Sequence, residues 1–319
     1  MDDSIHCRKT AREALWGHGA MLVFAALIAG AFSIGKMAAP HIDPAALTAL
    51  RFVLAATVMG FVLFLVGQRL EVRFWAAPWR YAVLGALMGG YFVLMFEALK
   101  TAQPVSTSAL FTLIPAMSAI FGWVLLRQRT TPWATGALGV GAVGAAWVIF
   151  RGDVDAMLSL RIGPGETIFF FGCICHALYT PMVKRLNRGE PVLVYTFGTI
   201  VGALVVVGIY AVPAVVGTDW PGLPGIVWFT VAYLAIFTTA GTFALLQFAA
   251  LRIDAGKVMA YGYLTPAFVA LYEGALGHGW PRASILVGVV LIVSALAILL
   301  LEPGEERDRA SGRDGLNPP

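Results

Sequence analysis

Apolar stretches of about twenty residues alternate with short polar loops along almost the whole chain, and each stretch is long enough to cross the hydrocarbon core of a membrane as a helix. Ten such stretches are present. The pattern therefore predicts an all-α membrane protein with ten transmembrane helices. The predicted spans are 15–38, 45–66, 79–99, 105–126, 132–150, 164–184, 192–216, 225–250, 256–277 and 281–301.

The stretches form two sets of five that share landmarks in the same order. The segment "FEALK" (Phe96–Lys100) matches "FAALR" (Phe248–Arg252), and "LIPA" around Pro115 matches "LTPA" around Pro266. Because five is odd, a second copy of a five-helix unit must cross the membrane in the opposite direction, as in the inverted repeats of many transporters. The expected parts are a cytoplasmic N-terminal segment (1–14), a first five-helix repeat (15–150), a connecting loop (151–163), a second repeat (164–301) and a disordered cytoplasmic tail (302–319).

Basic residues concentrate in every second loop. With the N-terminus placed in the cytoplasm, 16 Lys and Arg residues fall on the cytoplasmic side and 5 on the opposite side, and the last of the 22, Arg51, lies inside a span. Cytoplasmic loops of membrane proteins are enriched in Lys and Arg. The distribution predicts a multi-pass protein of the inner (plasma) membrane with both termini in the cytoplasm.

Composition agrees with this fold class and argues against several functions. The chain is 59% hydrophobic and 13% charged, whereas soluble domains are nearer half apolar and a quarter charged. The net charge of +4 comes from residues scattered through the loops and the tail, so nucleic acid is not an expected partner. The sequence has no Gly-rich phosphate loop, metal-ligand spacing or nucleophile elbow, so we expect no enzyme activity, no metal, no cofactor and no use of ATP.

Several short motifs follow one another in a set order. They are "GAFSIGK" (Gly30–Lys36), Pro44 through Arg51, Ala98–Lys100 with its counterpart Ala250–Arg252, Ile114–Pro115 with Thr265–Pro266, and the glycine-rich "GALGVGAVGAAW". In these motifs the chain resembles the EamA type of the drug/metabolite transporter superfamily, over residues 15–301. It departs from the family pattern at Gln128 and Gly279, where the family usually has the Glu of an "LGE" element, and Gly198 stands where the first half has Arg51.

The resemblance implies a secondary transporter with two inverted five-helix halves. Its expected partners are the lipid bilayer and a small polar metabolite, such as an amino acid or a drug-like compound, moved outward by alternating access around a central cavity. Two other classes stay open: a membrane scaffold or sensor that transports nothing, and an integral-membrane enzyme acting on lipid. The substrate, the coupling ion and the oligomeric state are not defined by the sequence.

Charged residues within the spans are the first candidates for substrate contacts, because a charge in hydrocarbon needs a partner or a cavity. Arg51 could attract an anionic group; the alternatives are a clamp between helices and an end that reaches the membrane surface. Glu97 and Glu273 could each bind a proton or an amine. For Glu97 the alternative is an ion pair with Lys100, three residues on.

Histidines and helix-breaking prolines supply the other candidates. His18 and His176 could carry protons, and Tyr179 follows His176 at a spacing that shares one helix face; the alternative for each histidine is a hydrogen-bonded packing role. Pro115 and Pro266 each free a backbone carbonyl within a span, which is tolerated where it lines a cavity. The remaining polar candidates for the cavity wall are Ser108, Thr112, Gln247, Tyr261 and Thr265, for which bonding to their own helix is the alternative.

Overall fold

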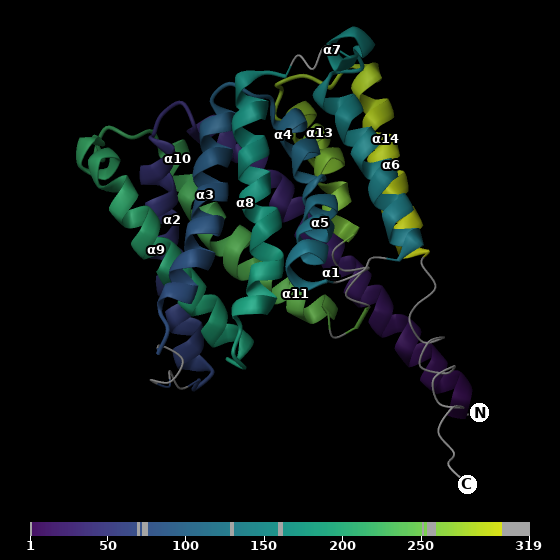
Figure 1. The fold of residues 1–319 in the computed structure, drawn as a ribbon, viewed down its shortest axis with the longest axis horizontal. Coiled ribbons are helices and arrows are strands. Elements are labelled where there is room, and N and C mark those ends of the chain that lie inside the picture. Colours follow the sequence, from purple (N-terminus) through teal and green to yellow (C-terminus); the bar gives the residue numbers. More distant parts are fainter. Residues whose placement is uncertain are drawn as a thin grey trace.

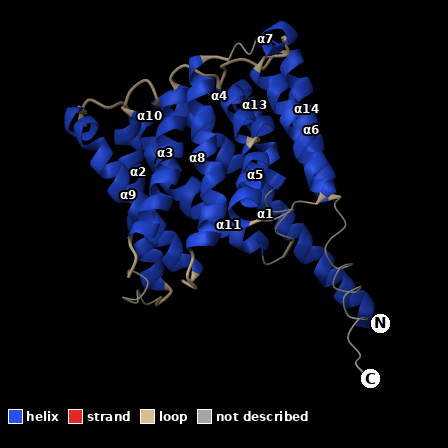
Figure 2. Ribbon diagram, viewed as in Figure 1, coloured by secondary structure: helices blue, strands red, loops and turns tan. Residues whose placement is uncertain are grey.

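The computed structural model describes the backbone of residues 2–68, 71, 76–127, 131–158, 162–250, 252–253 and 260–301. Side chains are described over the same ranges except for residues 2–12, 240, 243, 244, 247 and 250. Every regular element in this part of the chain is helical, with no strand (Figure 2). The predicted all-α class is confirmed.

The described residues of the first half form six helices. They are α1 (Asp2–Ala38), α2 (Pro44–Leu65), α3 (Trp79–Leu99), α4 (Pro104–Phe111), α5 (Ile114–Leu126) and α6 (Pro132–Ile149). A short helix, α7 (Val154–Leu158), lies between the halves. The second half contains α8 (Pro164–Leu186), α9 (Val192–Gly217), α10 (Gly225–Ala235), the π-helical turn η2 (Ile236–Gly241), α11 (Thr242–Ala250), the 3-10 turn η3 (Tyr261–Leu264), α13 (Thr265–Ala275) and α14 (Ala283–Leu300).

Eight helical stretches in the described part of the chain are long and apolar enough to cross a membrane. One of them, Pro104–Leu126, combines α4 and α5 across a break. The other two predicted spans correspond to segments that are interrupted or short, namely α10–η2–α11 and η3–α13. Apolar helical stretches long enough to cross a membrane therefore account for eight of the ten predicted spans.

Several helices begin at residues that suit a helix N-terminus. Pro44 opens α2, and the carboxylate of Asp43 accepts a hydrogen bond from the backbone N–H of Ala45 at 2.8 Å. Pro132 opens α6 after Thr131, whose hydroxyl accepts from the N–H of Ala134 at 3.1 Å. Pro is favoured in the first turn because it has no N–H to leave unpaired, and Asp and Thr satisfy the free N–H groups. These local signals explain why the predicted and observed starts agree closely.

Helices from the two halves pack against each other throughout the bundle. In the first half, α3 lies against α8 and α9; in the second, α10 and α11 lie against α1. Helix α2 packs on α9 and α10, and α6 packs along α14. Figure 1 shows α6 and α14 side by side at one edge and α2 and α9 at the other, with α1, α3, α8 and the broken helices between them.

The closest of these helix crossings depend on glycine. A Cβ built on Gly85 of α3 would collide with the backbone of Gly202 and Ala203 of α9, and a Cβ on Gly202 would collide with the backbone of Tyr81. Gly144 of α6 faces the backbone of α14 in the same way. Small residues let membrane helices approach to backbone contact, which replaces the hydrophobic drive that lipid does not supply.

A buried ion pair joins the start of α3 to the loop between α8 and α9. Arg80 Nη2 lies 2.7 Å from Glu190 Oε1, and both side chains are almost fully buried. Arg80 Nη1 also donates to the carbonyl of Leu186 at 2.6 Å, and Glu190 Oε2 accepts from the N–H of Arg188 at 2.6 Å. Burial by itself raises the pKa of Glu190, but the hydrogen bonds from Arg80 and from the backbone outweigh it, and the net pKa lies below the ordinary value.

We expect Glu190→Gln to destabilise the protein by about 2 kcal/mol near pH 7, because it removes the buried carboxylate that pairs with Arg80. A carboxyl with a lowered folded-state pKa stabilises the fold above its unfolded pKa, about 4.3, and loses this contribution as the pH falls through the folded value. The difference in melting temperature between wild type and Glu190→Gln should therefore be largest at neutral pH and should disappear below about pH 4.3.

Thermal unfolding in detergent across this pH range measures the effect. Glu97→Gln is the matched control, since Glu97 pairs with Lys100 at 2.8 Å but its side chain is 44% exposed, and such pairs contribute little. Equal decreases in melting temperature for Glu190→Gln and Glu97→Gln would contradict this account of the buried pair. So would a difference in melting temperature between wild type and Glu190→Gln that does not change with pH.

Candidate functional site

A cavity of about 360 Å³ lies in the middle of the bundle and is lined by both halves of the chain. Its wall comes from α1, α2, α3 and the junction of α4 and α5, and from α8, η2, α11 and η3. Nine of its 21 lining residues are Phe, Tyr or Met. These residues are Phe24, Phe32, Met88, Tyr91, Phe92, Met95, Phe111, Tyr179 and Tyr263.

Arg51 of α2 is the one Lys, Arg, Asp or Glu among the described residues of this wall. It is 3% exposed. Its guanidinium carbon lies 3.7 Å from the centre of the Phe92 ring, which is within the range of a cation–π contact. None of the described carboxylates forms an ion pair with it, and its Nε and Nη1 atoms are buried without a hydrogen-bond partner. The cavity thus has a cation whose charge and donors are only partly satisfied.

A π-helical turn, η2, supplies the hydrogen bonds that Arg51 makes. Thr238 and Thr239 both donate their hydroxyls to the carbonyl of Leu234, at 2.7 and 2.9 Å. Both hydroxyl oxygens accept from Arg51 Nη2, at 3.4 and 3.3 Å. Successive residues of a regular α-helix point about 100° apart, so the wider turn of η2 is what brings neighbouring hydroxyls to one cation. Such π turns occur frequently at functional sites.

His176 of α8 stands among aromatic rings on another part of the wall. Its ring centre lies 4.8 Å from that of Tyr91, 6.1 Å from that of Phe111 and 6.2 Å from that of Tyr179. Its Nδ1 atom is buried without a partner in the described part of the chain. Like Arg51, His176 therefore has hydrogen-bonding capacity left for a molecule inside the cavity.

Two interrupted helices, one in each half of the chain, reach the cavity. The chain leaves the helix after Phe111 and resumes at Ile114, with Pro115 in the first turn of α5. The turn η3 likewise precedes α13, which has Pro266 in its first turn. Proline withholds an N–H from the preceding turn, and Thr112, Pro115 and Gly262 at the two breaks line the cavity.

Four of the predicted side chains that lie away from the cavity wall have hydrogen-bond or ion-pair partners elsewhere. Glu97 forms its pair with Lys100 at the end of α3. Ser108 is fully buried and donates to the carbonyl of Val105 at 2.8 Å. Tyr261 and His18 bond to each other, with the hydroxyl and Nδ1 2.8 Å apart.

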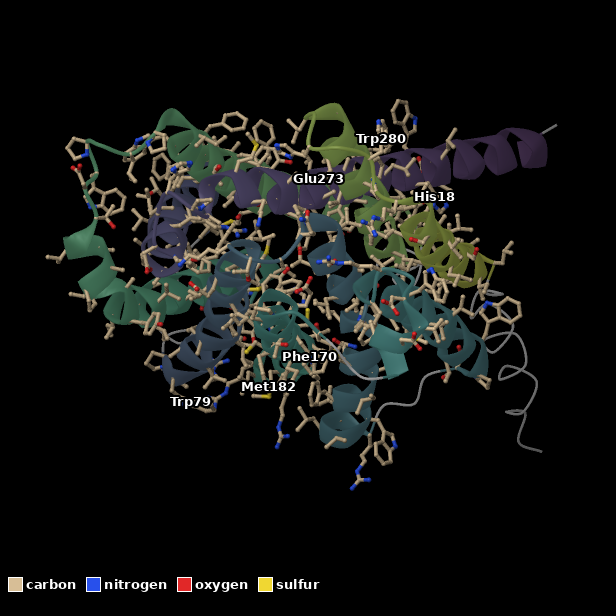
Figure 3. The ribbon with its side chains drawn as sticks, turned by 90° about the horizontal axis from the view of Figure 1, so that it is seen from above. His18, Trp79, Phe170, Met182, Glu273 and Trp280 are labelled. Carbon is tan, nitrogen blue, oxygen red and sulfur yellow. The ribbon has the colours of Figure 1, made fainter. Side chains whose placement is uncertain are left out.

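Three further candidates need separate mention. Thr265 is buried outside the wall. Glu273 lies on α13, which packs against α1, and its Oε2 is 3.2 Å from His278 Nδ1 (Figure 3). The side chain of Gln247 lies outside the described residues, as does Gln128. Arg51, Thr112, His176, Tyr179 and Pro115 are the predicted residues that the fold brings together around one space.

Sequence reasoning missed Phe92 and Thr238, which hold the guanidinium of Arg51. Phe92 is one of many phenylalanines in apolar spans, and its sequence position has no distinguishing mark. The segment "FTTAGT" has adjacent threonines in an apolar run, and this was the available signal. A regular helix, however, would have placed the two hydroxyls on different faces.

The basic residue of the "GAFSIGK" motif has a structural partner. Lys36 Nζ donates to the carbonyls of Lys100 and Ala102, at 3.3 and 3.1 Å. It thereby satisfies the free carbonyls where α3 ends and joins the end of α1 to the turn before α4. Lys36 is not part of the cavity wall.

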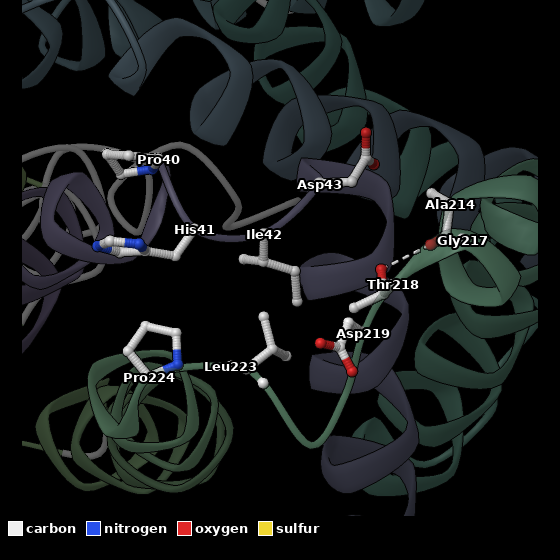
Figure 4. A pocket seen from close by; sticks show the side chains of 11 residues that line it. Pro40, His41, Ile42, Asp43, Ala214, Gly217, Thr218, Asp219, Leu223 and Pro224 are labelled. Atoms are coloured by element: carbon white, nitrogen blue, oxygen red, sulfur yellow. Dashed lines mark hydrogen bonds between the residues drawn. The ribbon is translucent and has the colours of Figure 1, made fainter.

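A second hollow, of about 600 Å³, opens between the loop before α2 and the loop between α9 and α10 (Figure 4). It is larger than the central cavity but lies open at the ends of the helices. Asp43 in its wall is engaged in capping α2, and Thr218 donates to the carbonyl of Ala214 at 2.6 Å. The central cavity is the better candidate site because it combines depth with buried polar atoms that have no partner.

The arrangement is that of an all-helical membrane protein with a polar site enclosed between its halves. The sequence model of the EamA-like transporter family matches residues 15–150 and residues 163–301. The chain belongs to the EamA-like transporter family. The resemblance inferred from the motifs is thereby confirmed, and the protein is a multi-pass membrane transporter of the drug/metabolite type.

Individual relatives agree with this assignment. The chain is 26% identical over 280 residues to the uncharacterized transporter YyaM of Bacillus subtilis (strain 168), and the match covers 86% of this chain and 91% of that protein. A solved structure titled "Crystal structure of protein" is similar with a TM-score of 0.63 at 20% identity, covering 91% of this chain and 98% of the other. At this identity the structural likeness shows a shared fold alone.

Proposed function

We propose that the protein is a ten-span secondary transporter that moves a small metabolite by alternating access around the central cavity. The observation that carries the proposal is the cavity itself, which lies between the two halves and contains a buried, incompletely paired Arg51. A charge inside a membrane bundle is expensive, and it typically marks the path of a substrate or an ion.

The packing of the helices supports two inverted repeats. If the first five spans correspond in order to the last five, α1 corresponds to α8, and α3 corresponds to α10–η2–α11. Helix α8 packs on α3 and α5, and α1 packs on the counterparts of those helices, α11 and α13. The pair α2 and α9 at one edge and the pair α6 and α14 at the other edge each join corresponding spans. This relation favours ten crossings, with α10–η2–α11 and η3–α13 as interrupted spans.

Two interrupted helices beside the cavity support the transport mechanism. Secondary transporters commonly bind their substrate at the midplane beside broken helices, and one repeat rocks against the other. In this chain the breaks before Pro115 and at η3 both border the cavity. We propose outward movement from an inner membrane in which both termini are cytoplasmic, in keeping with the excess of basic residues in the cytoplasmic loops.

Flux through purified protein in sealed liposomes tests the function. We expect counterflow of a labelled compound, such as an amino acid or a carboxylate, well above that of empty liposomes, with no requirement for ATP. An imposed pH gradient distinguishes a facilitator from a proton-coupled carrier. Of the three proton-carrying candidates, His176 lines the cavity, so His176→Ala should alter the pH-gradient response more than His18→Ala or Glu273→Gln.

Binding without flux for every compound that binds would contradict the transporter and favour a sensor. Chemical conversion of lipid by the purified protein would favour the enzyme alternative. Labelling of cysteines introduced into loop 151–163 tests the topology. Access from the cytoplasmic side would contradict the inverted arrangement.

A further inference from the structure

We propose that the cavity selects a small monocarboxylate with an apolar, preferably aromatic, body, whose carboxylate binds Arg51. This inference rests on the proposed function and narrows it to one substrate class. Three observations support it: the charge of Arg51 has no counter-charge on the described cavity wall, N–H donors of Arg51 have no acceptor among the described residues, and the rest of the wall is largely apolar.

The charge of the wall favours an anion. Among the described residues that line the cavity, Arg51 is the one with a formal charge at neutral pH. The acidic candidates Glu97 and Glu273 lie elsewhere and have partners of their own. A bound anion cancels the charge of Arg51. An ammonium group would find no carboxylate on the described wall, so an amine or a zwitterionic amino acid would bring an unpaired charge into a low-dielectric space.

The donors of Arg51 favour a carboxylate in particular. A guanidinium carries five N–H groups in a plane. Those on Nε and Nη1 have no acceptor among the described residues, and those on Nη2 have only the long contacts to Thr238 and Thr239. Phe92 covers a face of the guanidinium and leaves its edges for an acceptor. A planar carboxylate with two acceptor oxygens matches such edges.

The rest of the wall sets the body and the size of the ligand. Phe32, Met88, Met95 and Phe111 offer apolar surface and no strong acceptor. A volume of about 360 Å³ corresponds to that of roughly a dozen water molecules in the liquid. A compound with one ring and a short acid-bearing chain fits this space, whereas a dicarboxylate would bring a second negative charge without a second cation on the described wall.

Four compounds with the same phenyl and three-carbon skeleton separate these contributions: 3-phenylpropionate, its amide, phenylalanine and 3-phenylpropylamine. Affinity is measured by calorimetry on the purified full-length protein in detergent at pH 7. We expect 3-phenylpropionate to bind at least tenfold more tightly than the amide and than phenylalanine, and the amine to show no binding. A tenfold preference corresponds to about 1.4 kcal/mol.

Substitutions of Arg51 assign the selectivity to this residue. Arg51→Gln should bind the acid no more tightly than the amide, and Arg51→Lys should recover part of the preference, because it restores the charge without the planar fork. Arg252→Gln is the matched control. Arg252 also stacks on a phenylalanine, with its guanidinium carbon 3.6 Å from the Phe248 ring centre, but it is not part of the cavity wall, and its loss should leave the wild-type preference unchanged.

The wild-type series decides the inference even if an Arg51 variant does not fold. Three results would each overturn it. The first is equal affinity for the acid and the amide, and the second is tightest binding of the amine or of phenylalanine. The third is no binding of any of the four compounds by a protein that transports another compound. Selective binding of 3-phenylpropionate with no counterflow in liposomes would support the carboxylate site at Arg51 and contradict the proposed transport function.

Discussion

An Arg51→Met variant is expected to melt at a temperature roughly 4 °C higher than the wild-type protein while it loses carboxylate binding. Most substitutions of buried residues destabilise a protein. The opposite sign is expected here because Arg51 is a buried cation with no described counter-charge. Functional sites often hold groups that the fold alone would not favour.

The desolvation cost of Arg51 is larger than the stabilisation from its contacts, and this difference sets the sign of the stability change. Moving a charged group from water into a protein interior costs several kcal/mol even after relaxation. Against this cost, a desolvated cation–π contact contributes about 2 kcal/mol. The hydrogen bonds from Nη2 to Thr238 and Thr239 are 3.4 and 3.3 Å long, near the outer limit of such bonds. Methionine removes the charge and keeps a long side chain that can pack on Phe92, so we expect a net gain of about 2 kcal/mol.

Thermal unfolding of the purified protein in detergent measures this shift, and Arg252→Met is its control. Arg252 stacks on Phe248 and donates to the carbonyl of the same residue at 2.9 Å, at an exposed position. Its replacement should leave the melting temperature within about 1 °C of wild type, because exposed contacts contribute little. A lower melting temperature for Arg51→Met, with transport retained, would show that Arg51 is the structural clamp left open as its alternative role.

A Gly85→Ala substitution is expected to prevent assembly of the bundle, although it adds a single methyl group. The new Cβ would overlap the backbone of Gly202 and Ala203, where α3 crosses α9. A flexible side chain could move aside, but backbone cannot, so the helices would have to separate along their contact. Overpacking of a tight interface typically costs 1–3 kcal/mol or more, and lipid offers little hydrophobic drive to compensate.

Fluorescence-detected size-exclusion chromatography of the expressed protein measures this effect as loss of the monodisperse peak. Gly208→Ala on α9 is the matched control, since a Cβ there meets nothing within 4 Å. Replacing an unconstrained helical Gly by Ala should stabilise the protein by about 0.5–1 kcal/mol. A Gly85→Ala protein that elutes and melts as wild type would contradict the close crossing of α3 and α9.

The helix boundaries were predictable because their causes are local. The span predicted at 79–99 is the observed α3 (Trp79–Leu99), and the span predicted at 132–150 differs from α6 (Pro132–Ile149) by one residue. Apolar length sets how much of the chain must be helical in a bilayer, and Pro with Asp or Thr marks where a helix begins. Neither signal depends on which helices become neighbours.

The interior of the bundle was less predictable because it depends on how each helix is rotated about its axis. Tyr261 and Thr265 are four residues apart and would share one face of a regular helix, yet neither lines the cavity, and Tyr261 bonds to His18 instead. The π-helical turn changes the face that Thr239 presents and brings Thr238 to the same cation. One residue of additional turn alters every side-chain direction beyond it.

The sequence by itself determined that this is an all-helical membrane protein of the EamA-like transporter family, where most of its helices begin and end, and that Arg51 lies inside a membrane span. Apolar length, capping residues and the order of motifs suffice for this, since each acts within a short stretch of chain. Only the tertiary structure decided that Arg51 meets Phe92, Thr238 and Thr239 beside a space with no acidic side chain on its described wall. Those residues belong to three separate segments, and their meeting depends on glycine-mediated crossings and helix breaks that act across the whole bundle.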